Sequence, residues 1–190
     1  MPGPTPSSEA SGARCPLRPS LGESHLLNVS DLQLVRIRLT RVGDAVAVAR
    51  VYHQGWHAAH AAVLPWLTVE RPPEAFTAKV PGMLEHCLVA EVCGTEVVGF
   101  AAWNGAELGQ LFIEPSWLGT GLGAVLLAGA EKAMRESGVQ EAWLTCVVGN
   151  DRARAFYLRH GWTSRGVEDY PARTKDGQVP VAVWRLTKRL

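Results

Sequence analysis

The residues of this sequence with the clearest chemical potential are three alternating glycines, Gly119, Gly121 and Gly123. They follow a short apolar run at residues 111–113 and precede a segment whose apolar residues recur at helical spacing. Free backbone N–H groups at a helix start attract anions, and glycine lets a phosphate approach the main chain closely. The pattern predicts a phosphate-binding turn between a strand and a helix. The alternative is a tight turn without a ligand.

Two common phosphate-binding loops fit this segment poorly. A P-loop needs Gly-Lys-Ser/Thr at the helix start, whereas Gly121 is followed here by Leu122 and Gly123. A dinucleotide-binding fold needs G-x-G-x-x-G and an acidic residue that closes the next strand, whereas Glu141 opens that strand. A nucleotide-binding protein with an unusual loop therefore stays only as an alternative.

A third family matches better. Residues 111–124 resemble the acetyl-CoA signature of the GNAT-type N-acetyltransferases, in which an apolar strand and a proline precede Arg/Gln-Gly-x-Gly-x-Gly/Ala. Residues 150–162 resemble a later motif of that family, with Asn, Ala, Phe-Tyr and Gly-Trp at matching spacing. The resemblance covers roughly residues 35–190 and departs at Leu118, where the family usually has Arg or Gln. That change removes a side-chain donor to the pyrophosphate, and Arg152 or Arg154 could compensate for it.

The resemblance implies how acetyl-CoA would bind. The pantetheine arm would pair like an added strand with the backbone of the apolar run, and the pyrophosphate would rest on N–H groups of the glycine-rich turn. Asn150 would contact the cofactor, cap the helix that follows it, or do both. The expected cofactor-binding residues are Leu111, Phe112, Ile113, Leu118, Gly119, Thr120, Gly121, Leu122, Gly123, Ala124 and Asn150.

The resemblance also suggests two catalytic residues. Tyr157 would be the general acid that protonates the departing thiolate, since a phenol is protonated at neutral pH. The alternative for Tyr157 is an aromatic core residue. Glu107 stands where some members of the family carry a carboxylate that accepts the amine proton through water. A solvent-exposed glutamate at a strand end is the alternative for Glu107.

Histidines and tryptophans surround the expected acceptor site. His53, His57 and His60 fall near one face if the first helix extends that far, and they would line the acceptor pocket or face solvent. A metal site is a weaker alternative, because no acidic or thiolate partner is evident nearby, and we expect no metal. By the resemblance, Trp56, Trp66 and residues 168–178 lie where the acceptor pocket is usually built.

The elements that must position these residues follow from periodicity and turn residues. Asp44 could cap the first helix, and residues 56–82 contain four prolines, so any helices there are short. The remaining expected elements are strands at 34–40, 88–92, 96–103, 142–148, 163–167 and 180–187, a helix after the glycines with periodic apolar residues at 122–134 and a stop at Gly138, and a helix at 151–160. This order predicts an α/β fold. By resemblance, its mixed, mostly antiparallel central sheet has about seven strands, is splayed open between the fourth and fifth, and carries helices on both faces.

Composition limits the classes of protein. The 190 residues suit one domain, and a net charge of +1 gives no sign of nucleic-acid binding. Four cysteines without metal or redox spacing, no apolar run of membrane-spanning length and no signal-peptide core indicate reduced thiols in a cytoplasmic protein. We expect a disordered extension at residues 1–30 and an N-acetyltransferase domain at 31–190.

These observations lead to one main hypothesis and one alternative of a different class. The main hypothesis is an N-acetyltransferase that moves an acetyl group from acetyl-CoA to a primary amine of a small molecule or protein by direct attack on the thioester. A homodimer is compatible with the sequence. The alternative is a non-catalytic acyl-CoA-binding or sensing domain that kept the fold.

Overall fold

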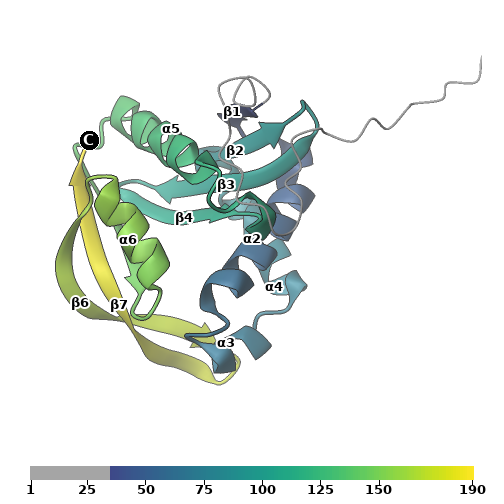
Figure 1. Ribbon diagram of the computed structural model, residues 1–190. Helices are drawn as coiled ribbons and strands as arrows, with labels where there is room; N and C mark the ends of the chain where they lie inside the picture. Colours follow the sequence, from purple (N-terminus) through teal and green to yellow (C-terminus); the bar gives the residue numbers. More distant parts are fainter. Residues whose placement is uncertain (1–34) are drawn as a thin grey trace, which may run out of the picture.

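The computed structural model describes residues 35–190, which form one seven-stranded sheet flanked by helices (Figure 1). The strand order is β1-β2-β3-β4-β5-β7-β6, and the pairing of β4 with β5 is parallel whereas the others are antiparallel. The extension expected at 1–30 lies outside the described residues, as do residues 31–34. The strands are β1 Val35–Leu39, β2 Cys87–Val92, β3 Glu96–Asn104, β4 Glu107–Ile113, β5 Glu141–Val147, β6 Thr163–Thr174 and β7 Gly177–Arg189.

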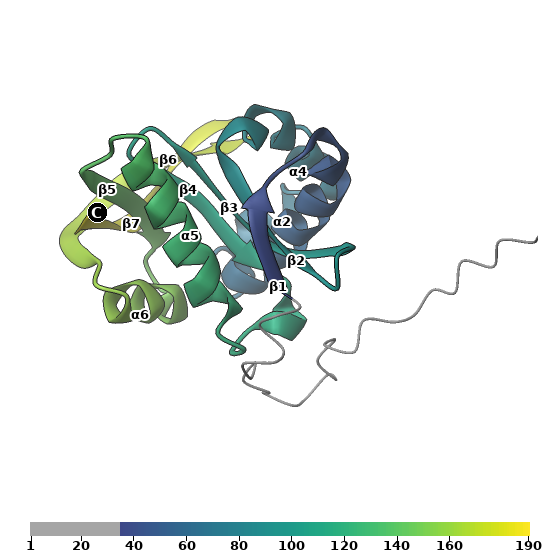
Figure 2. The same ribbon diagram turned by 90° about the horizontal axis from the view of Figure 1, so that it is seen from above.

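Helices cover both faces of the sheet, as the sequence predicts (Figure 2). Helices α5 (Leu122–Glu136) and α6 (Asp151–Arg159) lie on one face, and α2 (Ala45–His60) and α4 (Pro73–Thr77) lie on the other. Helix α3 (Pro65–Val69) follows α2. The described residues also contain four 3₁₀ turns: η1 Val42–Asp44, η2 Val80–Gly82, η3 Leu84–His86 and η4 Pro115–Trp117.

Strands β2 and β3 form the middle of the core and are buried on both faces. Val89 and Phe100 point to the side of α2, whereas Leu88 and Ala101 point to the side of α5. This alternation explains why both strands are almost continuously apolar in the sequence, since side chains point alternately to the two faces. The hairpin turn at residues 93–95 forms as predicted, with Gly94 at a φ of 73°.

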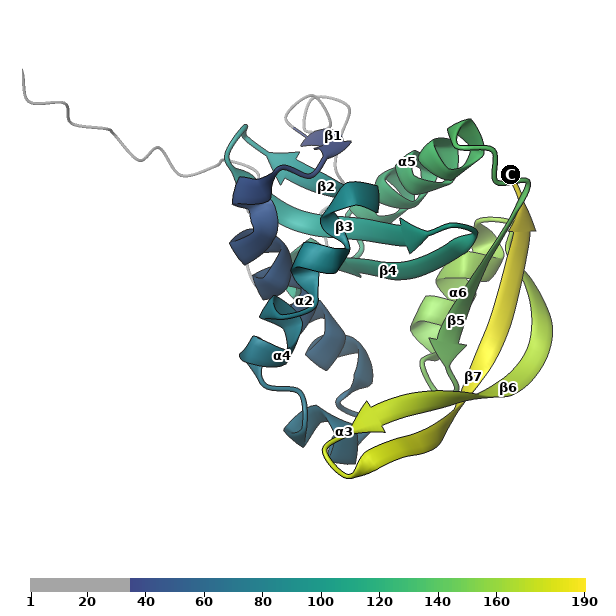
Figure 3. The same cartoon turned by 180° about the vertical axis from the view of Figure 1, so that it is seen from behind.

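Strands β4 and β5 separate soon after they begin (Figure 3). Their register contains one pair, Glu107 with Trp143, and Trp143 N–H donates to Ala106 C=O at 2.8 Å. On its other edge, β4 pairs Leu108 with Trp103 and Gln110 with Ala102, so Gly109 is an extra residue. Such a bulge bends a strand and increases its twist. The splayed sheet expected between the fourth and fifth strands is therefore present.

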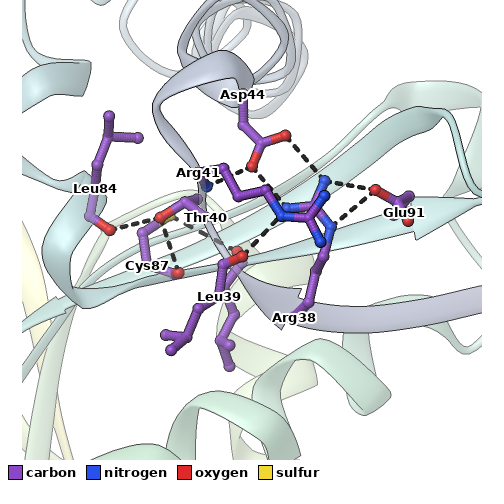
Figure 4. A network of polar contacts seen from close by, with 9 residues as sticks. Arg38, Leu39, Thr40, Arg41, Asp44, Leu84, Cys87 and Glu91 are labelled. Carbon is purple, nitrogen blue, oxygen red and sulfur yellow. Dashed lines mark hydrogen bonds and ion pairs between the residues drawn. The ribbon is translucent and has the colours of Figure 1, made fainter.

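The start of α2 is joined to the sheet by a network of charged groups (Figure 4). Arg38 on β1 donates to both carboxylate oxygens of Asp44, at 2.7 and 2.9 Å, and its Nε donates to Glu91 on β2 at 2.8 Å. Asp44 also accepts from the N–H of Arg41 at 2.6 Å. The helix-capping role predicted for Asp44 is wrong, because its side chain accepts no hydrogen bond from α2 and is occupied by Arg38 and Arg41 instead.

The closing hairpin is much longer than the sequence suggests. Strands β6 and β7 continue beyond the sheet as far as α3 (Figure 3). Ala172 and Val181 are buried there against Leu64 and Leu67, and these contacts stabilise strand segments whose own pattern is polar. The segment 168–178 is consequently mostly strand, with a turn at residues 175–176.

The described cysteines differ in state. Cys87 and Cys146 are free and buried, and burial raises the pKa of the first to about 12 and of the second to about 11. Cys93 is disulfide-bonded, so the expectation of a reduced thiol is wrong for this residue. Over residues 35–190, none of the helices combines the length and apolar character needed to cross a bilayer.

Candidate active site

The glycine-rich turn opens α5 in the geometry that glycine allows. Gly119 and Gly121 have φ values of 84° and 91°, in the left-handed region that residues with a side chain rarely adopt. Gly121 is the N-cap, and α5 begins at Leu122. Gly123 lies within the first turn, where an added Cβ would approach Ile113 Cδ1 to 3.2 Å. The turn predicted between the strand and the helix is therefore formed.

The glycine-rich turn presents several backbone N–H donors to its surroundings. Within residues 35–190, the N–H groups of Gly119, Thr120, Gly121 and Gly123 have no protein acceptor. The N-terminus of a helix adds positive potential at the same place. These four groups are the donors available to an anion.

Three neighbouring residues use their N–H groups internally. Leu118 donates to Pro115 C=O at 3.2 Å, Ala124 donates to Gly121 C=O at 3.0 Å, and Leu122 lies 3.4 Å from Thr120 Oγ1. Leu118 also packs its side chain against the core. These residues shape the turn rather than extend the set of free donors.

The separation of β4 from β5 leaves part of a strand edge without a partner. Glu114 N–H donates to Val98 C=O on β3 at 2.8 Å, and the antiparallel pattern then directs Phe112 toward β3 as well. By the same alternation, the N–H and C=O groups of Leu111 and Ile113 point toward β5, where no pairing continues. An extended ligand would find backbone partners along this edge.

Tyr157 lies on α6 beside β5. Its ring packs against Phe156 and Trp162, at centroid distances of 5.2 and 5.9 Å. Its hydroxyl has no hydrogen-bond partner among residues 35–190. Burial raises the pKa of Tyr157 well above its ordinary value, and the Cys146 thiol of β5 adds to that rise. A phenol in this place is a proton donor throughout the neutral range.

The start of α6 is capped by Asn150, whose Oδ1 accepts from the N–H of Ala153 at 3.2 Å. The predicted capping role is therefore confirmed, and cofactor contact stays a prediction. Arg154 turns inward, with its guanidinium 4.7 Å from the centroid of the Trp184 ring and its Nε buried without an acceptor among the described residues. Arg152 is exposed.

Glu107 lies at the one point where β4 and β5 still pair. Leu108 contributes to the core beside α5, so alternation directs Glu107 to the opposite face of the sheet. Burial raises the pKa of Glu107, and the positive charge of Arg185 on β7 partly offsets that rise. Arg185 itself lies over the Trp143 ring at 3.8 Å.

Aromatic and imidazole groups of α2 occupy this opposite face. The rings of His53 and His57 are 4.5 Å apart, and His60 stacks on Trp56 at 4.8 Å. His57 Nε2 donates to Arg71 C=O at 2.9 Å. In the described part of the chain, no three His, Cys, Asp or Glu side chains converge as a metal site requires. Of the two tryptophans expected near the acceptor, Trp56 packs against the hydrophobic core on the α2 side of the sheet, whereas Trp66 on α3 is exposed.

Two features of the site were not predicted from the sequence. The bulge at Gly109 had a signal, because an isolated glycine within a strand pattern indicates a bulge. Glu114, the 3% exposed N-cap residue of η4, is ion-paired with Arg50 of α2, which also donates to Val97 C=O at 2.9 Å. That pair ties α2 to the approach of the glycine-rich turn, and residues 64 positions apart carry no sequence signal of it.

Comparison with known proteins agrees with this geometry. The model of the Acetyltransferase (GNAT) family matches residues 43–162, which include the glycine-rich turn, β5 and α6. No curated protein sequence matches the chain significantly.

Solved structures with the same fold include three bacterial or archaeal proteins. A GCN5-related N-acetyltransferase from Rhodopseudomonas palustris has a TM-score of 0.65 and 21% identity, over 82% of this chain and 95% of its own. YncA from Salmonella typhimurium, solved with acetyl-CoA, has a TM-score of 0.61 and 19% identity, over 82% and 94%. The PaiA N-acetyltransferase from Thermoplasma acidophilum, solved with coenzyme A, has a TM-score of 0.58 and 20% sequence identity, over 82% of this chain and 99% of its own.

Proposed function

Because the chain belongs to the GNAT acetyltransferase family, we propose that it moves an acetyl group from acetyl-CoA to a primary amine. The observation that carries this proposal is the row of four backbone N–H groups, at Gly119, Thr120, Gly121 and Gly123, that find no acceptor in the described part of the chain. A diphosphate has oxygens for several such donors, and the helix start favours its negative charge. The structures of YncA with acetyl-CoA and PaiA with coenzyme A support the same ligand.

The unpaired edge of β4 supports the proposed position of the pantetheine arm. The backbone groups of Leu111 and Ile113 that point toward β5 are free to pair with amide groups of the arm, as an added strand would. The backbone of Phe112 is already paired with β3, and its ring packs on the α2 side of the sheet. The thioester would then lie between the two strands, beyond the pair Glu107 and Trp143.

The reaction needs one bond formed, one broken and two proton transfers. The neutral amine nitrogen attacks the thioester carbonyl, a C–N bond forms, and the C–S bond breaks. Tyr157, kept protonated by its raised pKa, gives its proton to the departing thiolate. Glu107 accepts the amine proton through a water molecule, and its raised pKa makes it a stronger base than an ordinary glutamate.

The two proposed catalytic groups lie on opposite faces of the split sheet. Tyr157 belongs to the face of α5 and α6, where the free N–H groups of the turn also lie. Glu107 faces the side of α2 and the β6–β7 hairpin. The cofactor and the acceptor would therefore enter from different sides and meet between β4 and β5.

A thiol-release assay over a panel of amines tests this function. We expect acetyl-CoA to release thiol only when a suitable amine is present. Calorimetry should show coenzyme A binding at least about a hundredfold more tightly than pantetheine, because pantetheine lacks the diphosphate that the turn would hold.

Three results would contradict the proposal. Coenzyme A binding without amine-stimulated release from any amine would favour the non-catalytic acyl-CoA-binding domain. Tighter binding of ATP or NAD than of coenzyme A would favour a nucleotide-binding protein. Equal affinities for pantetheine and coenzyme A would remove the role of the turn.

A further inference from the structure

Three cations lie near one another on the side of α2 and the hairpin. They are Arg71 in the linker between α3 and α4, Lys79 after α4, and Arg173 near the end of β6. Among residues 35–190, none of the three forms an ion pair. Partial desolvation lowers the pKa of Lys79, although its side chain is still largely exposed, and the positive charges of Arg71 and Arg173 lower it further. We call these three residues the cationic cluster.

The carboxylates of the same region form no ion pair with the cationic cluster among residues 35–190. Glu70 Oε2 accepts from the N–H of Lys175 at 3.1 Å, and the charge of Glu74 acts on His53. Like charges held together without compensation raise the free energy of the folded state. A bound anion would remove that cost.

Arg71 is held in place by contacts that leave most of its donors available. Its C=O accepts from His57 Nε2 at 2.9 Å, and its Nη2 donates to the C=O of Arg173 at 2.7 Å. A guanidinium has five N–H donors, and this contact uses one of them. The remaining donors form the planar fork that fits a carboxylate or another oxyanion.

The side chain of Tyr52, whose hydroxyl is within electrostatic reach of Arg71, is also without a hydrogen-bond partner among the described residues. Tyr52 is 3% exposed, and its hydroxyl makes no hydrogen bond within residues 35–190. Burial raises the pKa of Tyr52 to about 12, while the charge of Arg71 opposes that rise and Tyr170 of β6 adds to it. The Tyr52 hydroxyl interacts electrostatically with Arg71 and makes no hydrogen bond among the described residues, so it is a second donor for the same anion.

The cationic cluster lies on the proposed acceptor side of the sheet. The ring of Tyr52 packs on the ring of Phe112 of β4, 5.2 Å between centroids. Phe112 and Glu107 both alternate onto the face opposite α5. An acceptor bound on this face would have the carboxylate of Glu107 on one side and the cationic cluster on the other.

We propose that the acceptor of this enzyme is a small amine that also carries an acidic group, and that Arg71, Lys79, Arg173 and the Tyr52 hydroxyl bind that group. This inference rests on the proposed acetyl transfer to an amine. Glu107 would face the amine end, and the cationic cluster would receive a carboxylate or another oxyanion at the opposite end.

The hairpin favours a small acceptor over a protein. Its end is bonded to the α3–α4 region through Arg71 and Arg173 and through Glu70 and Lys175. Ala172 of the hairpin is buried against α3. The side on which the cluster lies is therefore bridged by protein, and an extended peptide would have to displace these contacts.

Matched pairs of amines test the acidic group. The probes are amino acids and their carboxamides, which differ in one negative charge. In the thiol-release assay we expect the wild-type protein to prefer the acid by at least about tenfold in kcat/KM, the scale of one lost charge-assisted hydrogen bond. Arg173→Gln and Lys79→Gln should reduce this preference mainly through KM, because both side chains are exposed and neither carries packing. Lys132→Gln, an exposed lysine of α5, is the matched control and should keep the preference.

A binding measurement separates this inference from the proposed function. Calorimetry with coenzyme A present compares an N-acetyl amino acid with its carboxamide, and we expect the acid to bind at least about tenfold more tightly. Neutral amines turned over as well as acids, or equal binding of the two acetylated products, would overturn the acidic-group proposal and leave the acetyltransferase standing. A peptide N-terminus used better than every small amine would also overturn it. Coenzyme A binding with no amine-stimulated release would overturn the proposed function instead.

Discussion

Two arginines meet α2 at opposite ends, and their surroundings differ. At the start of α2, Arg38 donates to Asp44 and Glu91, and all three side chains are about nine-tenths buried (Figure 4). Hydrogen bonding to Asp44 is the main cause of the raised pKa of Arg38, and Arg38 in turn lowers the pKa of Asp44. At the other end, the C=O of Arg71 accepts from His57 Nε2 and its Nη2 donates to Arg173 C=O, and within residues 35–190 its guanidinium forms no ion pair with a carboxylate.

The difference separates charges that are compensated within the protein and stabilise the fold from charges that are available to bind a ligand. A buried guanidinium with two carboxylates is satisfied within the protein, and removing it leaves two uncompensated charges. A cation whose charged neighbours are also cations gains no ion pair from its place in the fold, and Arg71 gains one hydrogen bond to a carbonyl, so a bound anion would compensate its charge. The N–H groups of the glycine-rich turn and the hydroxyl of Tyr157 are neutral groups, but they too have no hydrogen-bond partner among the described residues and are available to a ligand.

The largest expected effect comes from breaking the paired end. Arg38→Met should lower the free energy of unfolding by about 3 kcal/mol, because Asp44 and Glu91 then remain buried without their partner. Urea denaturation measures the change. Lys132→Met breaks the exposed pair with Glu136 and is the control, expected to cost less than about 0.5 kcal/mol. A similar small loss for Arg38→Met would show that the network contributes little to the fold.

The next effect concerns a hydroxyl without a protein partner. Tyr157→Phe should lower turnover at least about tenfold with little change in the affinity for coenzyme A, because only the proton donor is removed. Steady-state kinetics and calorimetry separate the two quantities. Unchanged turnover would reject Tyr157 as the acid, and a large loss of unfolding free energy would assign its hydroxyl to the fold.

A smaller effect is expected in the pH profile. Glu107 accepts a proton only when it is ionised, so activity should fall as the pH drops through its pKa, which burial holds above the ordinary value. Glu107→Gln should lower kcat/KM and abolish this acidic limb. Rates measured across pH 5 to 9, with coenzyme A affinity as the control, check it. An identical acidic limb in the variant would assign the titration to another group.

The smallest expected effect is on stability at the cationic cluster, and its sign is opposite to that of Arg38→Met. Lys79→Gln removes a charge that Arg71 and Arg173 repel, so unfolding free energy should stay unchanged or rise by up to about 0.5 kcal/mol. The lowered pKa of Lys79 means that the folded chain binds fewer protons, so wild-type stability should increase as the pH rises through the alkaline window below the unfolded-state pKa. Lys79→Gln should lose that increase. A loss of more than about 1 kcal/mol would place Lys79 among the structural charges.

The local sequence was sufficient to predict the helices α5 and α6, which begin at the glycine-rich turn and at Asn150. Gly121, Leu122 and the periodic apolar residues after them define the start of α5, and Gly138 marks its end at a φ of 93°. Asn150 and the spacing that follows it define α6 in the same way. These features depend on residues within about one helical turn of each other, so their physical causes lie in the sequence itself.

Other features depend on contacts between distant residues. The capping role expected of Asp44 fails because Arg38 competes for its carboxylate, and the sequence alone does not reveal that competition. The length of β6 and β7 depends on burial of Ala172 and Val181 against α3. Val181 lies within the strand predicted at 180–187, but Ala172 lies in a mostly polar segment beyond the strand predicted at 163–167, so the full length of the hairpin had no signal in the sequence.

The sequence by itself therefore determined the strand, the glycine turn and the helix that make a diphosphate site, because each is a local backbone preference. Only the tertiary structure decided which charges are satisfied. Arg38 and Arg71 are the same residue type, but folding places Asp44 and Glu91 beside the first and Lys79 and Arg173 near the second. Electrostatic energy depends on distances that folding creates, and that dependence is the physical reason for the division.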